Sequence, residues 1–409
     1  MTLLNADVTQ LNNCVACGGS QLREILDLGK QPLANDYLIE PVERNVYPLI
    51  LNLCEFCTHV QLSISVSPKL LFEHYLYVSS NSKTLSEYFE NLKKKIVNEF
   101  GDSGLLLDVG SNDGSFLAKF HGLSWETLGV DPAANLASHA SRAGVRTLSA
   151  FYNSSSATLL SNCFKVAVAM NVFAHTPNPQ EMLRGLSLNV APDGVAYIQT
   201  SQANMLVNSE FDTVYHEHIS FFNVKSMKAL LHRSGWFLQE VSIVNVHGKS
   251  YLWKIAKTPW QTESVKIRER EEELNGYYNL EFYESFHDRC NKVTKKVISY
   301  CEKAIKEGYK IASFGSAAKG NTFLNFAKII PDYIFDDTPL KIGRFSPLGN
   351  RVVMNPSQLG QIDDKLLFII PAWNLKKEIV ERLRMLRRNF KNDIVLTYFP
   401  EFTVTSLGD

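Results

Sequence analysis

The tetrapeptide Tyr215-His216-Glu217-His218 is the sharpest chemical signal in this chain. A histidine can accept a proton near neutral pH, a neighbouring carboxylate can orient it, and a phenol can donate to a developing oxyanion. Histidines near a domain surface are often structural, so the spacing alone leaves the catalytic interpretation open. Metal binding is an alternative, although the His-Glu-x-x-His spacing of helical metal sites is absent.

A second group of residues has the layout of an adenosine site. An apolar stretch ends near Asp108 and leads into a loop with Gly110 and Gly114, and Asp131 follows a second apolar stretch. Glycines let the backbone approach a ligand, and a carboxylate at this distance can accept both hydroxyls of a ribose. The Gly-x-Gly-x-x-Gly spacing for a pyrophosphate is absent, which favours S-adenosylmethionine over a dinucleotide. An ordinary strand-turn-helix is the alternative.

Two Cys-x-x-Cys motifs predict a structural zinc site. Cys14 and Cys17 form the first motif, and Cys54 and Cys57 form the second, so the chain offers four thiolates for a tetrahedral ion. A pair of redox motifs is the alternative, but neither motif opens a helix that would lower a thiol pKa. The remaining cysteines lie among apolar residues and are expected to pack as small hydrophobes.

The overall composition limits the possible partners. The chain has 409 residues, equal numbers of basic and acidic residues, and no apolar run long enough to span a membrane. A neutral charge balance argues against a nucleic-acid partner. We therefore expect a soluble, cytoplasmic protein with no nucleic-acid or membrane partner.

Short apolar stretches alternate with helical stretches from residue 105 onward, which predicts an α/β fold with a parallel, doubly wound sheet. The stretches 237–246 and 250–255 are expected to close one edge of this sheet as paired strands. Ligands bind outside the carboxyl ends of such strands, where Asp108, Asp131 and Asn171 lie. The expected domains are a zinc module at 1–78, a cofactor domain at 79–258 and a C-terminal domain at 259–409.

The C-terminal domain is predicted to be a second doubly wound α/β unit. Its loop Gly315–Asn321 follows an apolar strand and leads into a helix, so its amides could bind an anion and Lys319 could add a positive charge. Asp336 ends the next strand, and Arg344 is a further phosphate candidate. A simple packing loop and a solvated arginine are the alternatives.

Six motifs in order give a resemblance that covers nearly the whole chain. The motifs are the two Cys-x-x-Cys pairs, Tyr75 to Thr84, Asp108 to Gly114, Asn171 to His175, Tyr215 to His218, and Gly315 to Asn321. In these motifs the chain resembles nucleotide-sugar C-methyltransferases, which place a branching methyl group on C-3 of 4-keto deoxysugars.

The resemblance implies a Rossmann-like S-adenosylmethionine-dependent methyltransferase domain between the zinc module and the C-terminal domain. It implies that His218 is the base, with Tyr215, Glu217, His175, Tyr75 and Tyr77 in the same pocket. The cofactor would be held by Asp108, Gly110, Asn112, Asp131 and Asn171. The substrate would be held by Lys83, His216, Gly315, Lys319, Asn321, Asp336 and Arg344. The substrate would carry a nucleoside diphosphate, with thymidine favoured and guanosine or cytidine as alternatives.

Two departures from the family pattern leave the sugar and the methylated carbon open. Lys249 stands where the family has a second glycine after His247, and Thr176 follows His175 where an apolar residue is usual. An O-methyltransferase on a nucleotide sugar is the nearest alternative function. A scaffold protein with zinc knuckles is an alternative of a different class.

Overall fold

The computed structural model describes residues 7–73, 78–81, 83–160, 163–201, 203–388 and 390–408. Two compact units divide the chain. The first unit comprises Met1–Glu24, Leu51–Ala203 and Glu217–Phe282, and the second comprises Ile25–Ile50, Asn204–His216 and Tyr283–Asp409. Each unit is built from separate segments of the chain. The three-domain boundaries given above stay a prediction.

A sheet in the order β12-β13-β10-β9-β6-β7-β8 forms the centre of the first unit. Strands β6 to β10 pair in parallel, and β13 pairs antiparallel with both β10 and β12. Because β6 pairs with β7 on one side and β9 on the other, the chain changes its winding direction between β6 and β9. The predicted doubly wound fold is confirmed. The strands are β6 (Ser103–Val109), β7 (Ser124–Asp131), β8 (Thr147–Ser149), β9 (Phe164–Met170), β10 (Val190–Thr200), β12 (Phe237–Val244) and β13 (Ser250–Ala256).

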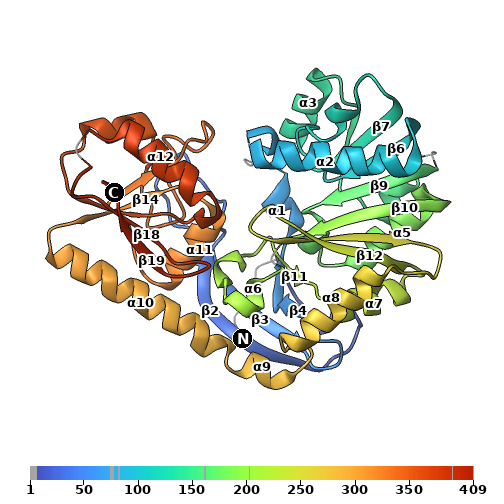
Figure 1. Cartoon of the computed structure of the whole chain (residues 1–409), viewed down its shortest axis with the longest axis horizontal. Coiled ribbons are helices and arrows are strands. Elements are labelled where there is room, and N and C mark those ends of the chain that lie inside the picture. Colours follow the sequence, from blue (N-terminus) through green and yellow to red (C-terminus); the bar gives the residue numbers. More distant parts are fainter. Residues whose placement is uncertain are drawn as a thin grey trace. The chain divides into compact units, whose positions relative to one another are not determined.

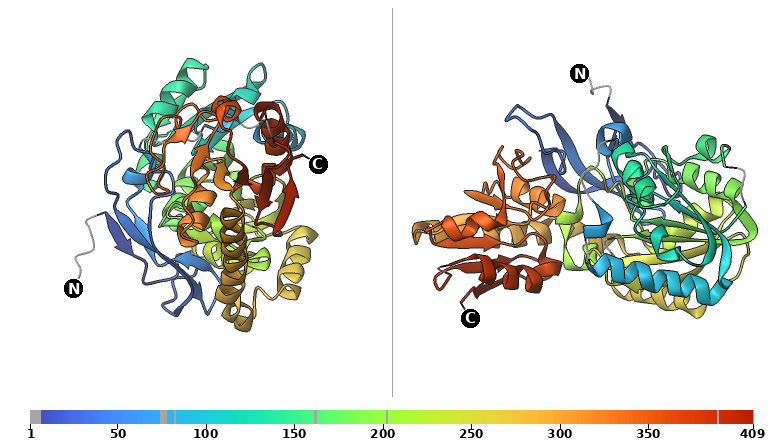
Figure 2. Two further views of the ribbon diagram at one scale, coloured as in Figure 1. Left: turned by 90° about the vertical axis from the view of Figure 1, so that its left-hand side faces the viewer. Right: turned by 90° about the horizontal axis from the view of Figure 1, so that it is seen from above.

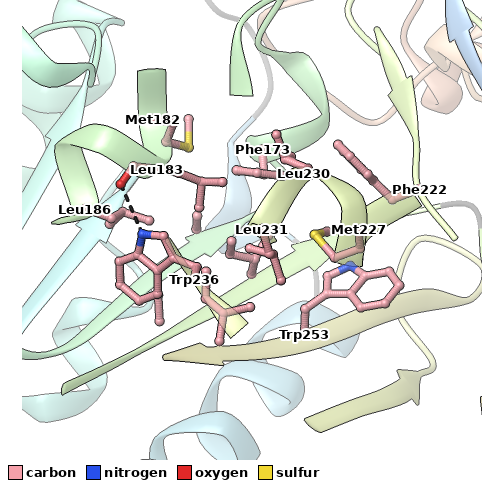
Figure 3. Packing of buried hydrophobic residues seen from close by; sticks show 14 of the residues in the cluster. Phe173, Met182, Leu183, Leu186, Phe222, Met227, Leu230, Leu231, Trp236 and Trp253 are labelled. Carbon is pink, nitrogen blue, oxygen red and sulfur yellow. Dashed lines mark hydrogen bonds between the residues drawn. The ribbon is translucent and has the colours of Figure 1, made fainter. Parts of the chain in front are cut away.

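Helices cover both faces of this sheet because successive strand residues point to opposite sides. Leu106 packs with the apolar stripe of α2, whereas its neighbour Leu107 belongs to the cluster that holds α5 and α7. Figure 1 shows α2 laid along the sheet, and Figure 3 shows Leu183, Leu231 and Trp236 in the opposite cluster. The helices that begin in this unit are α1 (Pro68–Phe72), α2 (Lys83–Phe100), α3 (Ala134–Arg142), α4 (Ser154–Ala157), α5 (Pro179–Asn189), α7 (Val224–Arg233), α8 (Glu263–Leu274) and α9 (Leu280–Glu284).

The second cysteine motif begins at the end of β3, which belongs to a four-stranded sheet in the order β11-β4-β3-β2. Its strand β11 comes from far along the chain and pairs antiparallel with β4, so that Ser220 lies opposite Gln61. A short antiparallel pair joins β1 to β5. The strands are β1 (Val8–Gln10), β2 (Leu22–Pro32), β3 (Val46–Cys54), β4 (Val60–Leu62), β5 (Ile64–Val66) and β11 (Ser220–Phe221).

The second unit contains a sheet in the order β16-β15-β14-β17-β18-β19, which confirms the predicted C-terminal α/β fold. All neighbouring strands pair in parallel except β18 and β19. The winding changes direction between β14 and β17, and Figure 2 shows this sheet and α10 from two further directions. The elements are α6 (Met205–Asn208), α10 (Phe286–Lys306), β14 (Lys310–Phe314), α11 (Ala318–Phe326), β15 (Tyr333–Phe335), β16 (Val353–Met354), β17 (Leu366–Ile369), α12 (Lys376–Leu386), β18 (Ile394–Thr397) and β19 (Thr403–Ser406). Across the described part of the chain, no helix has the length and apolar character needed to cross a membrane.

Candidate active site and metal centre

A cavity of about 600 Å³ lies at the carboxyl ends of β6, β7, β9 and β10. It therefore occupies the point where the sheet changes its winding direction, which is where ligands bind in open α/β sheets. Four of the predicted cofactor residues line it, namely Gly110, Asn112, Asp131 and Asn171.

The Asp131 carboxylate is held by two backbone amides. One oxygen accepts a hydrogen bond from the amide of Asn112 at 2.8 Å, and the other accepts from Ala133 at 2.8 Å. Burial raises the pKa of Asp131, while these two hydrogen bonds oppose the shift. A carboxylate oxygen has a second lone pair, so both oxygens can still accept from adjacent ribose hydroxyls.

The backbone around the cavity takes the left-handed conformation at three positions. Gly110 has φ +74°, Asn112 has φ +53° and Asn171 has φ +55°, and glycine and asparagine tolerate these values best. A Cβ atom at position 110 would lie 2.9 Å from the side chain of Val172. Glycine is therefore required there by both its backbone angle and its contact.

Asp108 lies in β6 and outside the cavity lining. Burial raises its pKa to about 8, and the charges of Asp131 and Asp113 add to the shift. The carboxyl is consequently protonated at neutral pH. Its predicted contact with the cofactor stays a prediction.

Three aromatic rings stack beside the cavity. The ring centroids of Phe72 and His175 are 5.6 Å apart with an interplanar angle of 2°, and those of His175 and His218 are 5.1 Å apart at 25°. The Nε2 atom of His175 is buried and has no hydrogen-bond partner among the described residues. Burial, reinforced by the charge of His247, lowers the pKa of His175 to about 4, so its ring is neutral near pH 7.

The remaining residues of the tetrapeptide differ in their surroundings. Glu217 and His218 are buried in the first unit, whereas Tyr215 and His216 belong to the second. The Nε2 atom of His216 lies 3.3 Å from the carbonyl oxygens of both Tyr47 and Pro48, which indicates a structural contact.

One predicted site residue, Lys83, is described by the structure but lies away from the cavity lining. Its side chain is exposed at the start of α2. Tyr75 and Tyr77 lie outside the described residues. Their predicted roles remain predictions.

The four predicted metal ligands come together. Their sulfur atoms lie within 4.8 Å of one another, with Cys14 and Cys57 at 3.6 Å and Cys17 and Cys54 at 3.5 Å. Tetrahedral zinc with Zn–S bonds of 2.3 Å needs sulfurs about 3.8 Å apart, so the cluster fits this ion. The amides of Cys17 and Gly19 each point to a cluster sulfur at 3.4 Å, which suits a thiolate acceptor.

A backbone amide in the loop after β14 donates to an aspartate that follows the neighbouring strand, just as the Asn112 amide in the loop after β6 donates to Asp131. The Asp336 carboxylate accepts from the amides of Ser316 at 2.7 Å and Thr338 at 2.8 Å. Unlike Asp131, it also faces a cation, because the Lys341 ammonium lies 3.4 Å away. Burial alone would raise the pKa of Asp336, but Lys341 and the hydrogen bonds outweigh this effect and lower it.

Three other predicted site residues of the second unit form contacts within the protein. Asn321 is buried and donates to the carbonyl of Ala34 at 2.8 Å, and Arg344 donates to the carbonyl of Tyr37 at 3.3 Å. The Lys319 ammonium lies 4.8 Å from the centre of the Trp373 ring. Asn321 and Asp336 thus stabilise the loop.

Sequence reasoning missed two residues of these sites. Gln199 lines the cavity at the end of β10, and Lys341 neutralises Asp336. The rule that selected Asn171 at a strand end would also have selected Gln199. No spacing in the sequence indicates that Lys341 pairs with Asp336.

Three family models match successive parts of the chain. The model described as "Putative zinc binding domain" matches residues 14–72, "Methyltransferase domain" matches 81–241, and "C-methyltransferase C-terminal domain" matches 245–396. The C-methyltransferase NovU from Streptomyces niveus is 28% identical over 391 residues, covering 91% of this chain and 92% of the relative.

Solved structures match more weakly. Magnesium protoporphyrin IX methyltransferase from Synechocystis PCC 6803 is 11% identical, with a TM-score of 0.33, over 42% of this chain and 79% of that one. The 1,6-didemethyltoxoflavin-N1-methyltransferase from Burkholderia thailandensis is 17% identical, with a TM-score of 0.34, over 44% and 80%. The sequence identities and TM-scores of these two structures are too low to support an assignment of the chain to a family. From the three models and the full-length relative, the chain belongs to the S-adenosylmethionine-dependent C-methyltransferases that combine a zinc-binding, a methyltransferase and a C-terminal domain.

Proposed function

We propose that this enzyme methylates the carbon next to the ketone of a nucleotide-linked 4-keto sugar, at C-3 of a deoxysugar. The observation that carries the proposal is the stacking of His218 on His175, which lines the same cavity as Asp131 and Asn171. Methylation of carbon requires removal of a weakly acidic proton, and an imidazole beside the cofactor cavity suits this task.

His218 is the proposed base. When it accepts a proton it becomes a cation, and the neighbouring His175 ring is neutral because burial lowers its pKa to about 4. The stack therefore imposes no repulsion on protonated His218. A charged His175 would instead lower the basicity of its neighbour.

The other residues of the tetrapeptide are proposed to support this step. Tyr215 would donate a hydrogen bond to the enolate oxygen that forms when the proton leaves, and Glu217 would orient the base. Bound S-adenosylmethionine supplies the methyl group, whose bond to sulfur breaks as the new carbon–carbon bond forms. Asp131, Gly110 and Asn171 would hold this cofactor in the cavity.

The second unit is proposed to hold the nucleotide of the substrate. Gly315 has φ +98° and leads into α11, whose first turn contains Lys319, so the start of this helix and the Lys319 ammonium are the proposed contacts of a diphosphate. Asn321 and Asp336 would act indirectly by fixing this loop. Thymidine diphosphate is the favoured carrier, and guanosine and cytidine diphosphates are the alternatives.

The test is a panel of nucleotide 4-keto sugars incubated with enzyme and S-adenosylmethionine and analysed by mass spectrometry. Each keto sugar is paired with its reduced 4-hydroxy counterpart. We expect a methylated product from a keto sugar only, with the new methyl on carbon. Methylation of a 4-hydroxy sugar at oxygen, or no product from any keto sugar, would contradict the proposal.

A further inference from the structure

A carboxyl group that the proposed mechanism does not use is buried in the second unit. Asp212 lies in the short turn Phe211–Thr213 and is 0% exposed. Its Oδ2 atom accepts a hydrogen bond from the indole nitrogen of Trp373 at 2.9 Å, whereas Oδ1 has no hydrogen-bond partner among the described residues. An ionised carboxylate with so few donors is costly to bury, so its charge depends on a nearby cation.

Lys319 is the cation beside this carboxyl group, and its charge lowers the pKa of Asp212. The Lys319 ammonium lies 4.8 Å from the centre of the Trp373 ring, so one indole lies against both groups. The packing at this point is close, because a Cβ atom on Gly320 would lie 2.4 Å from the side chain of Pro371. Glycine therefore lets the first turn of α11 approach the loop after β17.

The other titratable groups around Asp212 leave Lys319 as its counter-ion. Tyr398 follows β18 and stays neutral, because burial and the charge of Asp212 raise its pKa well above its usual range. Glu210 lies in the same segment, and its negative charge raises the pKa of Asp212. Arg289 of α10 bonds to the loop that precedes Glu210.

These influences leave Asp212 able to gain or lose a proton near neutral pH. Burial raises its pKa to about 7, while the charge of Lys319 and the hydrogen bond from Trp373 oppose the shift. The ionised form is thus stabilised by Lys319, and any anion that binds to Lys319 would weaken this support.

The position of these residues suits an anionic ligand. Lys319 follows β14 and Trp373 follows β17, and the sheet changes its winding direction between these two strands, where ligands bind in open α/β sheets. A diphosphate at Lys319 would compensate its charge and repel an ionised Asp212. The carboxyl group would then hold its proton more tightly than in the free enzyme.

We propose that Asp212 is a positioning residue that couples binding of a nucleoside diphosphate at Lys319 to the uptake of a proton. This inference rests on the proposed nucleotide site. Protonated Asp212 leaves Lys319 to the diphosphate, whereas ionised Asp212 competes for it. By linkage, affinity for the nucleotide decreases as pH rises above neutral, because the bound state holds a proton that the free enzyme has lost.

Calorimetry with thymidine diphosphate glucose tests the proposal. Both phosphates of this ligand are esterified, so the ligand itself does not titrate near neutral pH. Titrations near pH 7 in buffers of different ionisation enthalpy should show that the wild type takes up a fraction of a proton on binding. If the diphosphate raises the pKa of Asp212 by about one unit, affinity should be about fivefold or more lower at about pH 8.5 than at about pH 6.

Two substitutions separate this role from a structural one. Asp212→Asn keeps an acceptor for the Trp373 indole and removes the charge. We expect proton uptake to disappear and affinity at about pH 8.5 to exceed that of the wild type, because no carboxylate competes for Lys319. Lys319→Met should instead weaken binding at about pH 6 by about tenfold or more, without proton uptake. If Asp212 were only structural, Asp212→Asn would bind more weakly than the wild type at both pH values.

Asp332→Asn is the control. Asp332 accepts a backbone hydrogen bond from Ile311 at 2.9 Å and precedes β15, at the edge of the sheet opposite to Lys319. This variant should keep the proton uptake and the pH dependence of the wild type. Wild-type binding without proton uptake, or unchanged uptake in Asp212→Asn, would overturn this proposal alone. No binding at either pH would overturn the proposed nucleotide site together with it.

Discussion

A base that removes a carbon-bound proton must act before the methyl group moves, so His218 can be tested without methylation. Enzyme with its keto sugar in heavy water should exchange the proton next to the ketone, also with S-adenosylhomocysteine in the cofactor site. In His218→Asn we expect exchange and methylation to fall together by roughly 100-fold or more, because the base is lost at similar volume.

Tyr215→Phe serves as the comparison for this measurement. It would remove the one proposed hydrogen bond to the enolate oxygen and leave the proposed base, so both rates should fall less. Exchange at the wild-type rate in His218→Asn would assign the base to another residue. His175 and His216 would then be tested next.

Asp131 and Asp336 have the same hydrogen-bonded arrangement in different units, which makes them a matched pair. Asp131→Asn should weaken S-adenosylmethionine binding by about 1.5 to 3 kcal/mol, because a charged acceptor for the ribose is lost. The control Asp336→Asn should leave this affinity unchanged. Titration calorimetry measures both, and an unaltered affinity in Asp131→Asn would move the ribose site elsewhere.

Asp108 links stability to pH. Its pKa in the folded protein is raised to about 8, mainly by burial, whereas an unfolded aspartate titrates near 3.9. Between these values the folded state holds a proton that the unfolded state has lost, so stability decreases as pH rises through this window. Asp108→Asn removes this titration.

The melting temperature of the wild type should therefore fall more between pH 5 and pH 8 than that of Asp108→Asn, by on the order of several degrees. Thermal unfolding without ligand measures the difference. If the melting temperatures of the two proteins changed in parallel with pH, Asp108 would not titrate in this range.

At the scale of elements, the four-stranded sheet β11-β4-β3-β2 contacts the segment that carries His218. Ile219 accepts a backbone hydrogen bond from Leu62 of β4 and donates one to Ala174, each at 2.9 Å. The residue after the proposed base is thus fixed between β4 and the loop that carries His175. Gln61 of β4 in turn accepts from Val15, between the first two cysteines, at 2.8 Å.

Gln61 should therefore act as a positioning residue. Gln61→Leu is expected to slow proton exchange at His218 about tenfold or more, because small displacements of a catalytic group are costly. Affinity for S-adenosylhomocysteine should stay unchanged, and Gln61→Glu should recover part of the rate. Gln239→Leu controls for loss of a buried glutamine, and an equal loss of rate in that variant would make the role of Gln61 purely structural.

At the scale of the molecule, the sequence predicts the features that depend on local pattern. Asp131 and Asn171 could be placed at a common edge because strand ends in a parallel sheet meet there. The pairing of Ser220 with Gln61 and the contact of Lys341 with Asp336 could not be predicted in this way. The first pairing joins residues that are 159 positions apart in the sequence (220 − 61). The second contact depends on how the loop that carries Lys341 folds back.

The cysteine cluster connects the beginning of the chain to the end of β3. We therefore expect the loss of zinc to impair folding directly, and not catalysis alone. We expect near one equivalent of zinc per chain by elemental analysis. Cys54→Ser should lower the yield of folded protein, because a lost thiolate weakens the site that orders the cysteine motifs and β4. Since β4 also pairs with β11, folding and the placement of His218 should fail together. A metal-free variant with normal stability and normal proton exchange would show that the cluster serves neither purpose.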